Sequence, residues 1–475
     1  MKKIKKKIIF ISLLLAIIVL SAVKLYNTYA TGESQNANDT YTFDLTGDTT
    51  VTLAANERKT FIYQIKNTND GTVNYAVGYS SENQDTKVKV YYDSTDPTSG
   101  TIASNDYKYI KLRVINNSNT IASISLSTIL GYENGGELIL PSGVTKVTEV
   151  VYVASNYISN LYTGAEKSTV TANNITYNLA TSVNLMNDRL GDSSTGIDDG
   201  NIRYYGANPN NYVDIGDRTS NDKVILWRII GVFDGKLRIV RNETIGKYPY
   251  DTSASTVNSG QGVNEWSQAD SMKLLNPEYD SELIGGSLWY KGGSGSCYFG
   301  QNNGTTECDF TSTGLSNKSK DYITDQTVYL GSGDNNLIYP DQAYIMERGN
   351  TTRTCTDVKV CNDTVERTSS WTGKVALMYP SDYGYAVDLS LCKKTLSAYN
   401  DSTCINNNWL KTPIGWLMTP YTSDYYRMWA VINAGSVSRG RAYYSDYNVR
   451  PVVTLKANII FESGAGTSTD PFGVA

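Results

Sequence analysis

Short runs in which apolar and polar residues alternate dominate the first third of the sequence, and turn-forming residues separate them. The clearest runs are Thr60–Ile65 and Tyr109–Val114, and Asp96-Pro97 is one of the turn signals between them. A period of two places every second side chain on the same face of a strand. Strands of this length and spacing are typical of two packed antiparallel sheets. The sequence therefore predicts an all-β sandwich over residues 41–152.

A composition poor in charge and lacking histidine limits the chemistry of the chain. Only 19% of the residues are charged, the formal net charge is −5, and there is no histidine. Without imidazole, Ser-His-Asp and Cys-His nucleophiles and the usual zinc sites are excluded. A negative net charge argues against nucleic-acid binding, which requires neutralisation of phosphates. Carboxylate chemistry, lysine nucleophiles and calcium sites remain open, but a binding or structural role is favoured over catalysis.

The N-terminus has the order of charge and hydrophobicity of a secretory signal. Lysines between Lys2 and Lys7 precede an apolar run from Ile8 to Val23, and Ala30 offers a small residue before a cleavage point. This order predicts export across a membrane. Residues 1–30 are then either a cleaved signal peptide or an uncleaved membrane anchor with its lysines inside. Residues 31–40 are polar and are expected to be a flexible spacer.

Six cysteines fall in the C-terminal half of the chain as three pairs of near neighbours. They are Cys297 and Cys308, Cys355 and Cys361, and Cys392 and Cys404. An even number of cysteines in an exported chain indicates disulfides. The spacing favours three local bridges over the other connectivities. A zinc knuckle, the alternative, requires CxxC spacing, and the sequence has none.

Strand and helix signals mix after residue 180 and predict an α+β domain over residues 180–462. Residues 153–179 are expected to be a connector that begins with a short helix, and residues 463–475 are expected to be a tail. The predicted fold class is therefore mainly β, with an α+β C-terminal domain.

Three local patterns within the second domain are specific enough to predict elements. Ala180–Leu190 has the character of a helix. Asp234-Gly235 lies between two apolar runs and is a strong signal for a hairpin. The spacing of Met272 and Leu275 predicts a short helix, capped by Ser267 or Asn264.

Two resemblances go beyond these patterns. Gln64–Gly71, followed by the alternating Val73, Tyr75 and Val77, resembles the Ig-like domains of bacterial fibre and camelysin-type surface proteins. Four segments of the second domain are together similar to a large group of uncharacterised surface proteins of gut Firmicutes. They are Trp227–Gly231, Asn264–Ser267, Leu377–Tyr385 and Val449–Val452. The C-terminal domain of that group resembles the C-type lectin fold in its formylglycine-generating-enzyme branch, and the resemblance covers residues 180–460.

The second resemblance implies one of two functional classes. True oxidases of the formylglycine-generating branch use a pair of reactive cysteines late in the domain. No cysteine follows Cys404 in this chain. The same fold also serves as a scaffold that displays a variable surface. We therefore expect a binding domain without catalytic activity.

The segment Tyr421–Arg450 has the composition of such a binding surface. Tyr, Ser, Asn and Arg are abundant in it, and these types form paratopes because rigid aromatic area costs little entropy. This composition also resembles that of the target proteins of diversity-generating retroelements, although the lack of histidine argues against diversification. The alternative is a structural tyrosine-rich hairpin with Met428, Ala430 and Ile432 facing inward. The residues expected to bind ligand are Tyr425, Tyr426, Arg427, Arg439, Arg441, Tyr443, Tyr444, Asp446 and Tyr447.

Three further groups of residues have structural or metal-binding interpretations. Asp192, Asp198 and Asp199 could bind calcium, but no calcium-loop spacing is present, so a solvated turn is favoured and no cofactor is expected. Ion pairs are expected for Glu347, Arg348 and Asp382. The tryptophans at the starts of apolar segments are expected to fill the core. They are Trp227, Trp266, Trp371 and Trp416.

These features of the sequence together predict an extracytoplasmic protein that is either displayed on the cell surface or secreted. An Ig-like stalk would present a disulfide-stapled, C-type lectin-like domain to an unidentified protein or glycan ligand. Contact with a membrane would come from the N-terminal segment, if it is uncleaved. The alternatives are an oxidase of the formylglycine-generating type and a structural subunit of a surface fibre.

Overall fold

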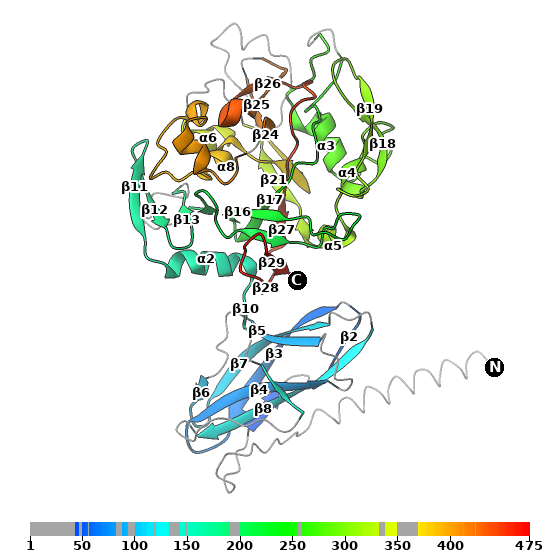
Figure 1. The fold of residues 1–475 in the computed structure, drawn as a ribbon. Helices are drawn as coiled ribbons and strands as arrows, with labels where there is room; N and C mark the ends of the chain where they lie inside the picture. The colour runs from blue at the N-terminus through cyan, green and yellow to red at the C-terminus, as the bar shows by residue number, and fades with distance from the viewer. Residues whose placement is uncertain are drawn as a thin grey trace, which may run out of the picture. The chain divides into compact units, whose positions relative to one another are not determined.

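The computed structural model describes two compact units, one ending at Tyr152 and one running from Val153 to Ala475 (Figure 1). No helix in the described part of the chain is long and apolar enough to cross a bilayer. The signal or anchor expected over residues 1–30 lies outside that part. The described residues are 43–46, 50–55, 57–81, 88–93, 100–116, 120–132, 143–147, 150–189, 200–254, 259–331, 338–348, 369–411, 413–422 and 424–475.

The first unit consists of two packed sheets. Its strands are β1 (Phe43–Thr46), β2 (Thr50–Leu53), β3 (Arg58–Asn67), β4 (Val73–Ser81), β5 (Val88–Asp93), β6 (Gly100–Ile102), β7 (Tyr107–Asn116), β8 (Ala122–Tyr132), β9 (Thr145–Lys146) and β10 (Val150–Val151). One sheet has the order β1-β3-β7-β5-β10, and the other has the order β2-β8-β4-β6 with β9 beside β4. All pairs are antiparallel except β5 with β10. The predicted β-sandwich is confirmed.

Alternation along the strands explains why this unit is a sandwich. In β7, Ile110, Leu112 and Val114 are buried, whereas the intervening residues are partly exposed. In β3, Tyr63 and Ile65 are likewise buried. These side chains meet those of the second sheet in one core, because successive residues of a strand point to opposite faces.

The second unit is a larger mixed domain. Its strands are β11 (Ser168–Ala172), β12 (Ile175–Ala180), β13 (Leu185–Asn187), β14 (Ile202–Tyr204), β15 (Tyr212–Asp214), β16 (Trp227–Phe233), β17 (Lys236–Arg241), β18 (Ser294–Tyr298), β19 (Thr305–Asp309), β20 (Ile323–Thr324), β21 (Gln326–Tyr329), β22 (Ser370–Gly373), β23 (Val375–Leu377), β24 (Gly415–Pro420), β25 (Arg427–Ile432), β26 (Ser436–Arg441), β27 (Pro451–Leu455), β28 (Phe461–Ser463) and β29 (Phe472–Val474). Its helices are α2 (Ala154–Gly164), η1 (Trp266–Gln268), α3 (Asp270–Leu275), α4 (Leu288–Lys291), α5 (Asn317–Tyr322), α6 (Pro340–Glu347), α8 (Pro380–Tyr385), η2 (Leu396–Ala398), α9 (Ser402–Asn406) and η3 (Asn433–Gly435).

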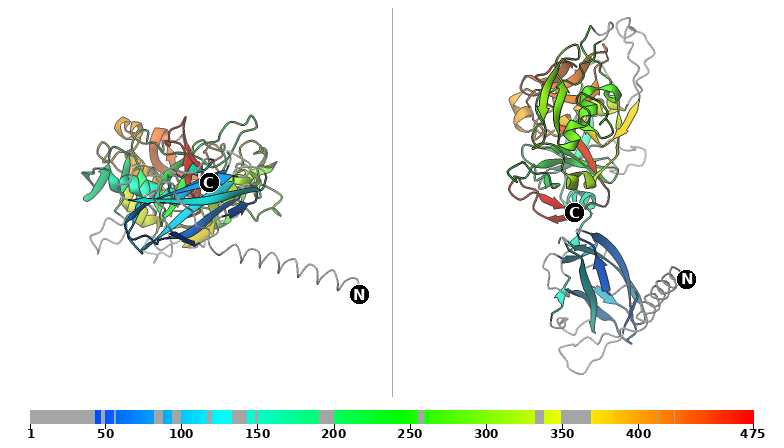
Figure 2. Two further views of the ribbon diagram at one scale, coloured as in Figure 1. Left: turned by 90° about the horizontal axis from the view of Figure 1, so that it is seen from below. Right: turned by 90° about the vertical axis from the view of Figure 1, so that its right-hand side faces the viewer.

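One large sheet runs through this unit in the order β11-β12-β13-β14-β16-β15-β29-β28. It continues through β17, which pairs with both β16 and β27, and β27 pairs in turn with β20 and β23. The three-stranded sheet β24-β25-β26 is separate. The views agree that it lies at the end of the unit opposite β28 and β29 (Figures 1 and 2).

Three expectations about segment boundaries and elements are corrected by this topology. Residues 153–179 begin with the expected short helix α2, but Ile158 and Tyr177 lie in the core of the second unit. Ala180–Leu190 is not a helix: β13 pairs with β12 and β14 after a turn at Asn184, whose φ is +53°. Residues 463–475 are not a loose tail, because β29 pairs with β15 and β28 and Phe472 is buried.

The hairpin and the short helix are confirmed. β16 and β17 are joined by Asp234 and Gly235, whose φ values of +49° and +71° match the turn that Asp-Gly favours. Helix α3 buries Met272 and Leu275 as expected. The expected caps are wrong, since the N-cap residue of α3 is Ala269, without a side-chain cap, and Glu265 caps the preceding turn η1.

Two of the three expected local disulfides are present. Cys297–Cys308 links the paired strands β18 and β19, and Cys392–Cys404 ties a loop to α9. Cys355 and Cys361 lie outside the described residues. Each bridge spans a short loop, so each constrains local structure in the second unit.

Gly231 provides a test of the central sheet. It lies at an irregularity in the pairing of β16 with β17, and a Cβ there would collide with the carbonyl of Ile202 in β14. We expect Gly231→Ala to lower the unfolding free energy of the second unit by about 1–3 kcal/mol. All seven tryptophans follow Val153 in the sequence, so tryptophan fluorescence in urea follows this unit.

The matched control is Gly164→Ala at the end of α2, where a Cβ would meet nothing within 4 Å. We expect this substitution to be neutral or slightly stabilising. Equal unfolding midpoints for Gly231→Ala and the parent would contradict the close approach of β14 and β16.

Candidate functional site

The residues expected to bind ligand lie on and around the β25–β26 hairpin. The strands are antiparallel, with Arg427 opposite Arg441 and Trp429 opposite Arg439. Side chains alternate between the two faces of the sheet, so these four residues share one face. The other face carries Met428, Ala430 and Gly440. The structural alternative expected apolar residues on one face of the hairpin only. Instead β25 is buried on both faces, because Trp429 and Val431 are buried as well as Met428 and Ala430.

The loop before β25 is held by a single buried amide. Asn264 Nδ2 donates to the carbonyl oxygens of Tyr421, Asp424 and Arg427 at 3.1, 2.8 and 2.9 Å. The backbone N–H of Asn264 also donates to the Tyr425 carbonyl at 3.0 Å. This arrangement fixes the loop that carries Tyr425 and Tyr426. Sequence reasoning placed Asn264 in a resemblance motif and considered it as a helix cap, but did not predict its contact with this loop.

The loop after β26 is joined to the first loop and to the body of the domain. Ala442 N–H donates to the Tyr426 carbonyl at 2.8 Å. The Ala442 carbonyl accepts from the backbone N–H groups of Tyr250 and Asp251 at 2.8 and 3.2 Å. The two loops, far apart in sequence from residues 250–264, are therefore anchored to that segment by main-chain hydrogen bonds.

The arginine face is lined with aromatic rings. Arg427 pairs with Asp424 at 3.0 Å and lies 5.2 Å from the Tyr426 ring. Arg439 lies over the Tyr421 ring at 4.9 Å. A hydrogen bond to the Tyr443 hydroxyl raises the pKa of Arg441. Tyr425 and Tyr426 also meet edge to face, with ring centroids 5.4 Å apart.

The remaining expected residues lie on the opposite face. A Cβ on Gly440 would meet the Tyr447 ring, which places Tyr447 on the face away from the arginines. Tyr447 is only 7% exposed and stacks between Trp416, at 4.2 Å, and Tyr444, at 5.7 Å. An open hollow of about 180 Å³ lies here. It is lined by Ile414, Ile432, Tyr444, Asp446 and Tyr447.

The expected site is thus divided into two surfaces around the edge strand β26. Tyr443 and Tyr444 connect them, since their rings meet edge to face at 5.0 Å. The arginine face contains Arg427, Arg439 and Arg441 with their tyrosines, and the hollow contains Tyr444, Asp446 and Tyr447.

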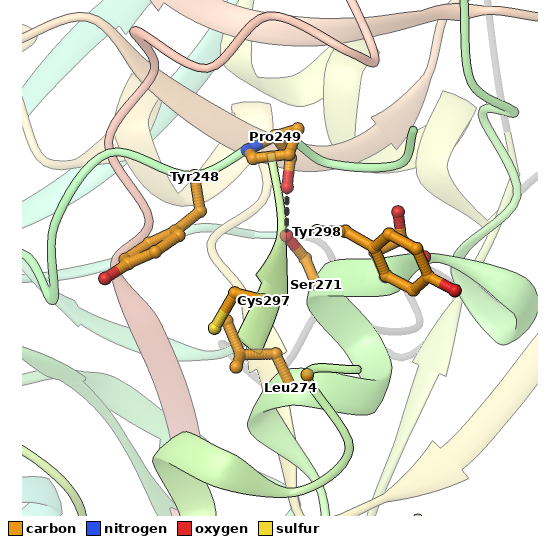
Figure 3. Close-up of a pocket in the computed structure, with 8 residues that line it drawn as sticks. Tyr248, Pro249, Ser271, Leu274, Cys297 and Tyr298 are labelled. Atoms are coloured by element: carbon orange, nitrogen blue, oxygen red, sulfur yellow. Dashed lines mark hydrogen bonds between the residues drawn. The ribbon is translucent and has the colours of Figure 1, made fainter. Parts of the chain in front are cut away.

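A second, smaller cavity lies beside α3 (Figure 3). Tyr248, Ser271, Leu274 and Tyr298 line it, and the Ser271 hydroxyl donates to the Pro249 carbonyl at 2.7 Å. Its volume of about 10 Å³ leaves room for roughly one water molecule. It is therefore too small to be a ligand site.

The buried carboxyl group of Asp251 and the partly buried one of Asp270, which lines this cavity, fix the segment that holds the binding loops. Asp251 accepts from the Ser253 hydroxyl and the Val263 N–H, both at 2.6 Å. Asp270 accepts from the Thr252 hydroxyl at 2.7 Å. Burial, followed by the charge of Asp251, raises the pKa of Asp270 to about 7.

A buried ion-pair network fills the body of the second unit, including pairs expected from the sequence. Arg203 binds Asp188 at 2.6 Å and Asp382 at 2.8 Å. Burial alone would raise the pKa of Asp382, but Arg238 and Arg203 together lower it. Glu347 pairs with Arg348 at 3.5 Å, and burial raises the Glu347 pKa to about 7.

The remaining structural and metal-site expectations have mixed outcomes. Trp227, Trp266 and Trp416 are buried as expected. Trp371 is only partly buried and packs edge to face on Trp266 at 5.9 Å. Asp192, Asp198 and Asp199 lie outside the described residues. Within the described ranges, no group of three or more carboxylate or cysteine side chains is placed to hold a metal ion.

No protein-family model matches the chain, and no curated protein matches it. Solved structures with slight similarity include the ASH/PapD-like domain 7 of human CEP192, the Salmonella enterica SafA pilin with its SafB chaperone, and the YadV chaperone. Their sequence identities are 11, 9 and 7%, with TM-scores of 0.13, 0.14 and 0.11. The alignments cover 24, 43 and 41% of this chain and 95, 91 and 92% of those chains. Similarities this weak carry no functional information.

Asn264 provides a test of how the binding loop is held. Asn264→Ala removes three hydrogen bonds to buried carbonyls, and we expect the second unit to lose about 1–3 kcal/mol of unfolding free energy. Asn264→Asp should be more harmful, because a carboxylate only accepts and would face three carbonyl oxygens. Amide hydrogen exchange over residues 421–427 should accelerate in both variants.

The control is Asn407→Ala, which removes one exposed hydrogen bond to the Thr403 carbonyl. Exchange over residues 421–427 should be unchanged in this variant. If Asn264→Asp were as stable as the parent, the amide could not be the element that holds the loop.

Asp270 provides a test of pH dependence. Its pKa is raised from 3.8 to about 7 in the folded state. The folded protein therefore keeps a proton that the unfolded chain releases, and stability falls as pH rises through this window. We expect Asp270→Asn to reduce this loss between pH 4 and 7, with urea unfolding followed by tryptophan fluorescence.

Asp222→Asn, an exposed change in a turn, is the control and should leave the pH profile unchanged. The buried Asp251 remains in the Asp270 variant, so the slope should be reduced and not abolished. If Asp270→Asn had the same dependence of stability on pH as the parent, the raised pKa of Asp270 would be refuted.

Proposed function

We propose that the chain is an extracytoplasmic binding protein whose second unit presents the β25–β26 hairpin and its flanking loops to a ligand. The observation that carries this proposal is the arrangement held by Asn264. Loops rich in tyrosine and arginine are fixed to the domain by the buried side-chain amide of Asn264 and by main-chain hydrogen bonds. A surface that is already ordered loses little conformational entropy when a partner binds.

The chemistry of the surface supports recognition. Tyrosine offers a broad ring and a hydroxyl with few rotatable bonds, and arginine offers a planar set of donors. Tyr425, Tyr426, Tyr443 and Tyr444 are all partly exposed and contact one another in pairs. The hollow beside Tyr444 adds a concave surface to this aromatic area.

Extracytoplasmic location and a C-type lectin-like fold are parts of the same proposal. The disulfides Cys297–Cys308 and Cys392–Cys404 support location in an oxidising compartment. A large sheet that carries a small separate sheet with exposed loops is compatible with a display scaffold. The ligand class proposed from the sequence is a protein or a glycan.

We expect Tyr443→Ala/Tyr444→Ala to weaken ligand binding at least about tenfold while the domain stays folded, because aromatic anchors dominate binding energy. The measurement is a combined glycan and protein array probed with the full chain, followed by titration of each hit. Urea unfolding monitored by tryptophan fluorescence verifies the fold.

The matched control is Tyr107→Ala/Tyr109→Ala in β7 of the first unit. These tyrosines are 50% and 56% exposed and also meet edge to face, at 5.4 Å. Binding that survives loss of Tyr443 and Tyr444 but disappears in this control would contradict the proposed site and place recognition on the sandwich.

A structural role in a surface fibre is the second candidate, and one observation favours it. Ile62, 59% exposed, lies on the same outer face of the sandwich as Tyr107 and Tyr109. Large exposed hydrophobic side chains that share one face, here beside Lys66 and Lys111, are a feature of protein contact surfaces. The oxidase alternative would have to use Cys355 and Cys361, since the other four cysteines form disulfides.

A further inference from the structure

Two arginines on the proposed binding surface lack the acidic partner that the third one has. Arg427 and Arg441 lie directly opposite each other on one face of the hairpin, a placement that is unfavourable for like charges. Asp424 neutralises Arg427. Among the described residues no carboxylate pairs with Arg439 or Arg441, in a protein whose net charge is −5. The hairpin therefore carries a local, uncompensated positive charge.

Neighbouring tyrosines contact both guanidinium groups. Arg439 is exposed and lies over the Tyr421 ring at 4.9 Å, and within the described residues no carboxylate takes up its N–H groups. Arg441 binds the Tyr443 hydroxyl, which occupies only part of its five donors. Each group is thus oriented by a tyrosine and can still accept a carboxylate in the bidentate manner typical of arginine.

The backbone beside these arginines is also available. β26 is an edge strand that pairs only with β25 in the described sheet, and η2 packs against another part of the strand. The bond from Ala442 N–H to the Tyr426 carbonyl shows that even-numbered residues of β26 point their peptide groups towards β25. The peptide groups of Arg439 therefore point away from β25, and within the described residues no hydrogen bond occupies them.

The spacing of the two arginines matches an extended peptide. Residues two apart in a strand lie on one face and are separated by about 6.6–6.8 Å. Alternate side chains of a partner strand have the same separation, so two acidic side chains at i and i+2 can face Arg439 and Arg441 together. The net charge of the whole protein is −5, so the positive charge that would attract such a segment to this face is local.

We propose that the ligand of this surface is an extended peptide segment with acidic side chains at alternate positions, lying along the open part of β26. This proposal rests on the proposed function and specifies its ligand class. Arg439 and Arg441 bind the carboxylates, and the peptide groups of Arg439 that point away from β25 bind the main chain. An acidic glycan could satisfy the arginines, but it lacks the amide groups that would pair with the strand edge.

The test uses the full chain and two fluorescein-labelled peptides, Thr-Glu-Thr-Glu-Thr-Glu-Thr and its counterpart with glutamine in place of glutamate. Fluorescence anisotropy should show binding of the glutamate peptide that weakens as salt rises. The double variant Arg439→Gln/Arg441→Gln should bind about 10- to 100-fold more weakly, because two charge-assisted contacts are lost. Arg439→Lys should give an intermediate loss, since lysine keeps the charge but not the bidentate geometry.

Arg218→Gln is the matched control, because Arg218 is similarly accessible but is paired with Asp214 outside this surface. It should bind like the parent. N-methylation of alternate amides in the glutamate peptide should weaken binding if the strand edge takes part. Unfolding midpoints should be equal for all variants.

The outcomes separate this proposal from the proposed function. Equal binding of the glutamine peptide, or unchanged binding by the double variant, would overturn the acidic-peptide assignment. Binding of oligogalacturonate but not of the glutamate peptide would overturn it in favour of an acidic glycan. In each of these cases a binding surface would remain. If neither these probes nor the array gives a ligand that depends on Tyr443 and Tyr444, the proposed function fails as well.

Discussion

Buried loop carbonyls must find hydrogen-bond donors, and in this protein asparagine side chains supply many of them. Asn264 provides donors to three carbonyls of the binding loop. Asn67 does the same for Gly71, Ile102 and Ala103 in the first unit. An unpaired buried carbonyl would cost about 1–3 kcal/mol, so one well-placed amide decides whether a loop can be buried at all. The abundance of asparagine in the sequence thus has a structural reason.

This constraint shapes the candidate site. Because the loops are held from beneath, their tyrosine and arginine side chains need not stabilise the backbone and are left near the surface. The buried stack of Trp416 on Tyr447 supports the Tyr444 ring in the same way. Recognition elements supported in this way are positioned before a partner arrives, which favours affinity over adaptability.

Sequence reasoning succeeded where the determinants are local. The alternation of apolar and polar residues predicted the sandwich strands, and Asp234-Gly235 predicted the hairpin. The short sequence separation of the cysteines predicted the disulfides Cys297–Cys308 and Cys392–Cys404. It failed where pairing partners are distant. β29 was expected to be part of a tail because its partner β15 lies more than 250 residues earlier.

Prediction of the candidate site from the sequence was limited in the same way. Composition indicated the right segment, but composition cannot tell which face of a strand a residue occupies. That assignment follows from the register of β25 with β26 and from the contact of Gly440 with the Tyr447 ring. Nor could the sequence reveal that Asn264 reaches a loop about 160 residues later.

The three hydrogen bonds that the Asn264 amide donates to the binding loop all go to main-chain oxygens, and this has an evolutionary consequence. Every residue type presents the same carbonyl, so exchanging the side chains at Tyr425 or Tyr426 leaves the three hydrogen bonds intact. The Ala442 contacts are likewise between backbone groups. A lineage could therefore replace the chemistry displayed on these loops one residue at a time while inheriting the same attachment, so that specificity and foldability are free to change separately.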